Sequence, residues 1–246
     1  MITEQSAPVG VQRAWQIVTD YALEVEKIEP ASLVAVYAIG SLPGGYYRAG
    51  QSDLDVALIV RDGSDATWES AGSEFATLNQ KYQALCGDGT GFEGFPVVEN
   101  RLYPAHAGGL LPMPQLNARL KLQSRLLYGS YDLEWIPMPT KADWIADAIR
   151  LNTAWQADGG DTQLNRMGAS ALVSHGLLLM RQYLALREGR ICFNKLELVD
   201  YYLKCDPSAS DRPSFETLKH HLEGRTLAEE ELETLRKWIA KFHKVP

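Results

Sequence analysis

The chain has 246 residues, of which 46% are apolar, and a formal net charge of −7. This is enough apolar sequence to bury a core, so we expect a globular protein of one large or two smaller domains. No apolar stretch approaches the roughly 20 residues needed to span a bilayer, and the N-terminus does not resemble a signal peptide, so we expect a cytoplasmic protein without a membrane partner. The three cysteines show no metal-site spacing and are expected to be reduced.

The negative charge belongs to the front half of the chain. Residues 1–140 hold 9 Lys and Arg against 16 Asp and Glu, whereas residues 141–246 hold 15 of each. Nucleic-acid binders neutralise phosphates with clustered basic side chains, so this distribution excludes a long nucleic acid as the expected partner. An acidic front half favours a cationic small molecule, although acidity that serves solubility alone accounts for it equally well.

The front half alternates helical and strand patterns. Apolar residues three or four apart predict a first helix, and short β-branched runs ended by glycine or aspartate predict strands. The Pro96 ring places the third strand at a sheet edge, or lets it pair only from Val97. The expected elements in chain order are a helix over Val11–Lys27, strands over Leu33–Ile39 and Val56–Val60, a helix over 64–86 and a strand over Phe95–Tyr103.

Beyond Thr140 the pattern is helical only. Glycine and proline separate the helical segments, with a break expected from Pro207 to Pro213. The expected helices are Asp143–Trp155, Asn165–Glu188, Lys195–Leu203 and Leu227–Phe242. We therefore expect an α+β protein with a head over residues 1–140, containing a small mixed sheet and flanking helices, and an all-helical domain over 141–246.

Two aspartates stand two residues apart at the start of the second predicted strand. The strand period of two places the carboxylates of Asp53 and Asp55 on one face. Magnesium commonly joins one or two carboxylates to substrate phosphates, so this pair can share a divalent cation. A lone pair of this kind is weak evidence, because aspartates also cap and end elements.

The preceding strand ends in a candidate phosphate-binding turn. Gly40 allows close approach of the backbone to a phosphate, and the hydroxyl of Ser41 can donate a hydrogen bond to it. One strand thus ends in a phosphate cradle, and the next begins with metal ligands.

Together these residues resemble the nucleotidyltransferase superfamily that includes DNA polymerase beta and the antibiotic nucleotidyltransferases. The likeness lies in Gly40-Ser41, the twelve residues from Ser41 to Asp53, and the run Ser52-Asp53-Leu54-Asp55 followed by apolar residues. The resemblance implies transfer of a nucleoside monophosphate from ATP, with two Mg²⁺ ions held by three carboxylates. It implies nucleotide binding by Gly40, Ser41 and Ser52.

The third carboxylate of this family comes from a later strand. We assign it to Glu99, on the third predicted strand, as metal ligand, general base or both. An outward-facing charge on a strand is the alternative for Glu99. Glu93 is the competing candidate, but the glycines around it predict no strand that would fix its direction.

A second, weaker resemblance covers the tail. The segment from Tyr183 through Gly189 and Lys195 is similar to a helix, glycine, lysine, helix element of the streptomycin/spectinomycin adenylyltransferases. Together with Arg125-Leu-Leu-Tyr-Gly129 before the boundary, it extends the likeness over most of the chain. It implies a helical domain that closes over the nucleotide and presents Lys195 to its phosphates. A solvent-exposed lysine at a helix start is the equal alternative, and Cys192-Phe193 is bulkier than the family pattern.

Other residues carry weaker expectations. Tyr46 and Tyr47 can stack on a ring or simply pack their loop, and Arg48 can meet a phosphate. His175 lies in an apolar helix, which favours a core histidine over a catalytic base.

The expected function is adenylylation of a hydroxyl on a small, cationic acceptor of the aminoglycoside kind. Two alternatives stay open. One is a protein- or tRNA-modifying nucleotidyltransferase of the toxin–antitoxin type, and the other is a nucleotide-binding regulator that has kept the fold without turnover. No GxSxG or GxxxxGK[ST] sequence is present, which argues against a serine hydrolase and a P-loop kinase.

Overall fold

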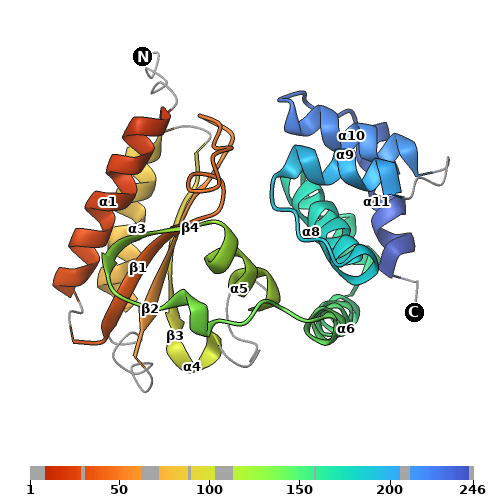
Figure 1. Cartoon of the computed structure of the whole chain (residues 1–246). Helices are drawn as coiled ribbons and strands as arrows, with labels where there is room; N and C mark the ends of the chain where they lie inside the picture. The colour runs from red at the N-terminus through yellow and green to blue at the C-terminus, as the bar shows by residue number, and fades with distance from the viewer. Residues whose placement is uncertain are drawn as a thin grey trace, which may run out of the picture. The chain divides into compact units, whose positions relative to one another are not determined.

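A computed structural model of the chain describes residues 9–28, 31–61, 72–87, 90–102, 113–157, 159–205 and 211–243. The chain divides into two compact units, residues 1–139 and 140–246, and each is described by itself (Figure 1). Within the described ranges no helix is long and apolar enough to cross a membrane.

The first unit is built on a four-stranded mixed sheet. Its strands β1 to β4 lie in the order β3-β2-β1-β4, with β1 antiparallel to both neighbours and β2 parallel to β3. The bounds are β1 Leu33–Ile39, β2 Leu54–Val60, β3 Phe92–Val98 and β4 Ser124–Gly129. The start of β2 therefore lies beside the end of β1 on one side and the start of β3 on the other.

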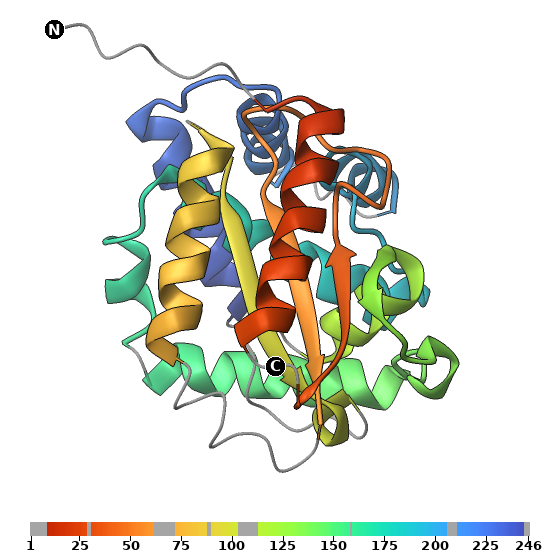
Figure 2. The same cartoon turned by 90° about the vertical axis from the view of Figure 1, so that its left-hand side faces the viewer.

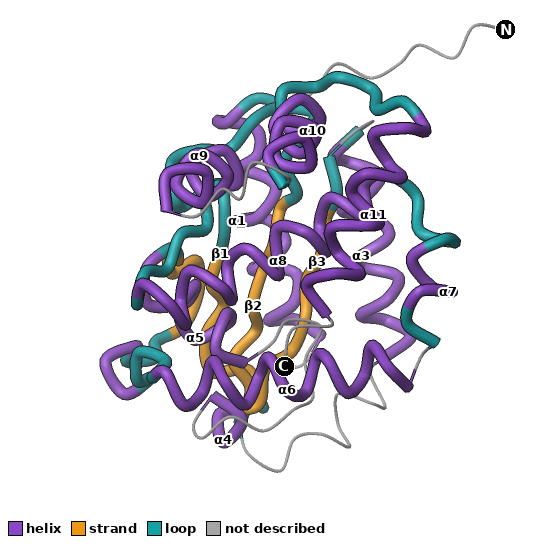
Figure 3. The backbone as a smooth tube through the Cα atoms, turned by 90° about the vertical axis from the view of Figure 1, so that its right-hand side faces the viewer, coloured by secondary structure: helices purple, strands orange, loops and turns teal. Residues whose placement is uncertain are grey.

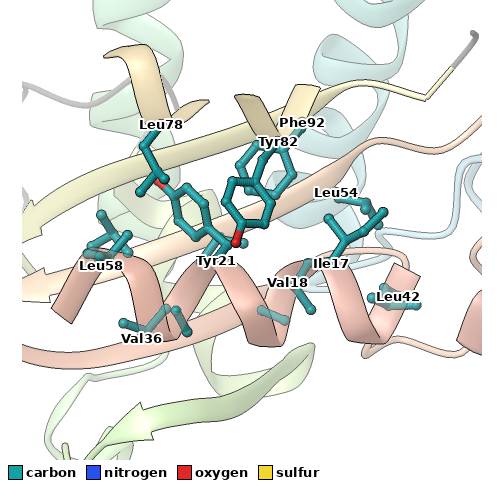
Figure 4. Packing of buried hydrophobic residues seen from close by; sticks show 14 of the residues in the cluster. Ile17, Val18, Tyr21, Val36, Leu42, Leu54, Leu58, Leu78, Tyr82 and Phe92 are labelled. Carbon is teal, nitrogen blue, oxygen red and sulfur yellow. The ribbon is translucent and has the colours of Figure 1, made fainter. Parts of the chain in front are cut away.

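Two helices cover one face of this sheet. Helices α1 (Val11–Ile28) and α3 (Gly72–Cys86) lie side by side over it (Figure 2). Between them and the strands Tyr21 is fully buried, with its ring centroid 4.7 Å from that of Phe92 and 5.1 Å from that of Tyr82 (Figure 4). Burying these rings contributes to the apolar core that holds the sheet.

The opposite face carries smaller elements. Helix α5 (Met113–Leu122) packs its buried leucines on this face, beside the short helix α4 (Glu99–Leu102) and the 3₁₀ turn η1 (Leu133–Trp135). Successive side chains of a strand point to opposite faces of the sheet. In β2, Leu58 therefore points to α1 and α3, while Ile59 points to α5.

The second unit contains helices alone within its described residues (Figure 3). Helix α8 is central, since α6, α9, α10 and α11 all pack against it. The bounds are α6 Lys141–Ala157, α7 Asp161–Leu164, α8 Ala169–Glu188, α9 Lys195–Cys205, α10 Arg212–Leu222 and α11 Glu229–His243. The predicted α+β class with a helical C-terminal part is confirmed.

Two expectations for the helical unit need correction. Helix α10 is absent from the expected helices, and the expected break from Pro207 to Pro213 overlaps its start; Pro213 lies in its first turn, where proline is tolerated because that N–H has no helical partner. Helix α8 begins only at Ala169, after Gly168, instead of at Asn165. The predicted helix over 64–86 is described only from Gly72, so Trp68 falls outside the described residues.

The third correction concerns the strand over Phe95–Tyr103. Strand β3 is Phe92–Val98, because its parallel register with β2 runs from Leu54↔Phe92 to Val60↔Val98 and ends where β2 ends. The strand prediction at Glu99 is wrong, since Glu99 begins helix α4, and Tyr103 lies outside the described residues. Pro96 does lie on an edge strand, as expected.

Candidate functional site

Asp53 and Asp55 lie at the start of β2. The backbone N–H of Gly91, just before β3, donates a 3.0 Å hydrogen bond to Asp53 Oδ1. A Cβ at Gly91 would lie 2.4 Å from that oxygen, so a larger residue here would displace the Asp53 carboxylate from this position. Asp55 lies on the sheet face that carries Ile59 and helix α5.

Asp55 is paired with a cation from α5. Arg119 Nη1 lies 3.4 Å from Asp55 Oδ2, and the side chains are 16% and 22% exposed, respectively. Because the pair is partly shielded from water, its electrostatic interaction is stronger than that of a fully exposed pair.

Gly40 brings the end of β1 against this ion pair. Its φ is +85°, which favours glycine, and a Cβ there would come within 3.1 Å of Asp55 Oδ2. Since Ile39 is the register partner of Asp55, the Gly40-Ser41 turn and the carboxylates meet at one end of the sheet. The predicted juxtaposition is therefore present in the fold.

The loop after Ser41 is held down by its own tyrosines. Tyr46 donates from its hydroxyl to Gln123 Oε1 at 2.6 Å, and Tyr47 donates to the carbonyl of Val9 at 2.9 Å. The tyrosines thus do what the packing alternative expected.

The end of this loop is closed by a turn. The backbone N–H of Arg48 donates to Ser52 Oγ at 3.0 Å, and the N–H of Ser52 donates to the carbonyl of Arg48. Arg48 itself is exposed. Ser52 therefore shapes the entry to Asp53, and its assignment to nucleotide binding stays a prediction, as does that of Arg48.

The third carboxylate at this end of the sheet is Glu93. In the parallel register Asp55 is the partner of Glu93, and neighbouring strands lie about 4.8 Å apart. Glu93 alternates with Phe92 along β3, so its side chain shares the face of Asp55. The glycines on either side hid this strand from sequence reasoning, although Glu93 was the competing candidate.

Glu99 lies at the other end of the same strand. It follows Val98, the partner of Val60, and is six residues beyond Glu93. At about 3.3 Å per strand residue this corresponds to roughly 20 Å along β3. The register therefore does not bring Glu99 to Asp53 and Asp55, and its role as the third carboxylate stays a prediction that this placement does not support.

The environment raises the pKa of Glu93. Desolvation by its surroundings is the larger cause, and the negative charge of Asp53 adds to it. Accumulated negative charge of this kind is what a bound cation would relieve.

The carboxylate oxygens at this end of the sheet suit Mg²⁺, but they do not form a complete coordination shell. Among the described residues no group of three His, Cys, Asp or Glu side chains is gathered to hold a metal ion. Magnesium usually keeps waters and takes one or two carboxylates together with substrate phosphates, so the paired carboxylates fit that coordination.

Lys195 belongs to the second unit. Asn194 caps helix α9, because its Oδ1 accepts from the N–H of Leu196 at 3.1 Å, and Lys195 is the exposed first residue of the helix. Its predicted role toward phosphates stays a prediction.

His175 has a structural environment. Its Nε2 lies 2.8 Å from His243 Nε2, and the ring of Trp155 stacks on both imidazoles. Burial, with a smaller effect of His243, lowers the pKa of His175 to about 4. The core interpretation fits this geometry.

The chain has the nucleotidyltransferase fold with a helical C-terminal part. A similar solved structure is that of spectinomycin adenyltransferase AAD(9) from Enterococcus faecialis with ATP and spectinomycin. The TM-score is 0.63 at 17% sequence identity, and the match covers 94% of this chain and 99% of that chain. The sequence matches no protein-family model and no curated protein. The resemblance inferred from Gly40-Ser41 and the Asp53–Asp55 pair is thus confirmed for the fold.

Proposed function

We propose that this chain is a metal-dependent nucleotidyltransferase that moves AMP from ATP to a hydroxyl of a small, cationic acceptor of the aminoglycoside or spectinomycin type. One observation carries the proposal. Gly40 lies against Asp55, and Asp55 is the register partner of Glu93, so a phosphate-accepting turn and paired carboxylates meet at one end of the sheet.

The residues of this arrangement would divide the proposed reaction between them. Asp53, Asp55 and Glu93, which are not gathered into a ready metal site among the described residues, would hold Mg²⁺ together with the triphosphate, and the ion would supply charge stabilisation to the attacking and leaving oxygens. The Ser41 hydroxyl donates to a phosphate oxygen of ATP. Glu93, the register partner of Asp55, would accept the proton of the acceptor hydroxyl.

The helical unit would add a positive charge. We assign Lys195 to the nucleotide phosphates, supported by its position at the start of α9 after the similar helix and glycine element. The acidic balance of residues 1–140 supports a cationic acceptor, because such a surface attracts positive ligands. ATP and spectinomycin in the similar structure support the same choice of substrates.

Pyrophosphate release from ATP and Mg²⁺ tests the proposal across a panel of aminoglycosides, spectinomycin and lincosamides. We expect release with at least one aminoglycoside or spectinomycin, and AMP attached to that acceptor by mass spectrometry. Asp53→Asn and Asp55→Asn should abolish release. Asp132→Asn, which alters an exposed aspartate that caps η1, is the matched control and should retain it.

ATP binding without release for any acceptor would contradict the proposed acceptor class. It would favour a protein- or tRNA-modifying enzyme or a nucleotide-binding regulator. Incubation with labelled ATP and total protein or tRNA separates these two, because only a modifying enzyme transfers the label.

A further inference from the structure

Arg119 occupies a position that the proposed chemistry leaves unexplained. Helix α5 packs Leu116 and Leu120 into the sheet face of Asp55, and this anchoring directs Arg119 to the start of β2. Its Nη1 lies 3.4 Å from Asp55 Oδ2 and would lie 3.4 Å from a Cβ at Gly40. The guanidinium therefore contacts a proposed metal ligand and lies next to the phosphate-accepting turn.

The end of α5 is also tied to that turn. Gln123, directly after the helix, accepts from the N–H of Gly40 at 3.0 Å through its carbonyl and from the Tyr46 hydroxyl through its side chain. The N–H of Gln123 in turn donates to the carbonyl of Arg119 at 2.7 Å. These bonds hold the end of α5, which carries Arg119, against the turn.

We propose that Arg119 is a positioning residue that holds Asp55 until a divalent cation binds and then turns to the nucleotide phosphates at Gly40-Ser41. The inference rests on the proposed function. It adds that the divalent cation replaces the Arg119 guanidinium as the partner of the Asp55 carboxylate.

Electrostatics gives this exchange its direction. Asp53, Asp55 and Glu93 place negative charge on one face, and without a cation their repulsion would turn the carboxylates apart. Arg119 offsets this charge and keeps Asp55 oriented. A divalent cation binds carboxylate oxygen more strongly, and the phosphates that arrive with it offer the planar guanidinium a bidentate partner.

If this exchange occurs, a variant without the Arg119 charge should bind metal more tightly and ATP more weakly. Arg119→Met removes the competing cation, so affinity for Mn²⁺ in the absence of nucleotide should rise about three- to tenfold. The same variant loses a phosphate contact, so the KM for ATP should rise about tenfold or more while kcat falls less. Mn²⁺ binding is measured by electron paramagnetic resonance on the full chain.

Two further variants complete the experiment. Arg119→Lys keeps the charge and should restore the wild-type Mn²⁺ affinity but only part of the ATP affinity, because lysine lacks the planar fork. Arg125→Met removes the same charge from β4, where Arg125 lies 4.7 Å over the Trp15 ring, and should change neither quantity.

An unchanged or weaker Mn²⁺ affinity in a folded Arg119→Met protein would overturn the inference, because a merely structural arginine predicts that result. An equal rise in Arg125→Met would overturn it too, since the effect would then be one of net charge. Absence of nucleotide transfer by the wild type, with the Mn²⁺ shift present, would defeat the proposed function and leave the exchange at Asp55 supported.

Discussion

Asp55 on β2 and Glu93 on β3 are register partners in the parallel pair, and their side chains share the sheet face that α5 covers. This relationship assigns the third carboxylate of the proposed site to Glu93. It also makes Glu93 and Glu99 a matched pair for experiment, because both are glutamates of the same segment and lie at opposite ends of the strand.

Glu93→Gln should lower nucleotide transfer about a hundredfold or more, because the variant loses both a metal ligand and the proposed base. Glu99→Gln should retain transfer within about threefold, since the register does not bring it to the carboxylates. Steady-state pyrophosphate release measures both. Loss in Glu99→Gln with retention in Glu93→Gln would return the role to Glu99.

Glu93→Gln should also stabilise the metal-free protein at neutral pH. Desolvation and the charge of Asp53 raise the pKa of Glu93 in the folded state, so its ionisation costs stability as the pH rises through that value. We expect a higher melting temperature for the variant at pH 7.5 and a difference that vanishes below about pH 3, where the carboxyl is protonated in both states. A lower melting temperature at pH 7.5 would contradict this cause of the shift.

Gly91→Ala should weaken metal binding without unfolding the protein. The new methyl would lie 2.4 Å from Asp53 Oδ1, and the flexible end of that side chain can rotate away. We expect Mn²⁺ affinity to fall about tenfold, while stability changes by less than about 1 kcal/mol. Gly72→Ala, which meets nothing within 4 Å, is the matched control for the added methyl. Equal Mn²⁺ affinity in both variants would refute the role of Gly91.

His175 should make the protein sensitive to acid. Because its pKa is lowered to about 4 in the folded state, the contribution of neutral His175 is present above about pH 6.5 and is lost as the pH falls toward 4. This loss amounts to about 3 kcal/mol. His175→Phe keeps a ring against Trp155 and should flatten the pH dependence of thermal unfolding between pH 6.5 and 4.

The control for this prediction is another histidine. His220 is exposed on α10, so His220→Phe should keep the pH dependence of the wild type. If His175→Phe also kept it, protonation of other groups would account for the acid sensitivity.

The local sequence pattern by itself determined several elements of the fold and part of the candidate site. Apolar spacing placed α1, β1 and most of β2, and the glycine-serine turn followed by alternating aspartates predicted the meeting of a phosphate turn with carboxylates. These features lie within about 15 residues of one another, so neighbouring strands bring them together through a single antiparallel pairing.

Only the tertiary structure decided the rest. The parallel pairing of β2 with β3 joins residues 38 positions apart and places Glu93, instead of Glu99, beside Asp55, because register depends on the partner strand rather than on local spacing. The Arg119 contact with Asp55 spans 64 positions and arises from packing of α5 on the sheet. No sequence period encodes such contacts, since they depend on how buried faces pack together.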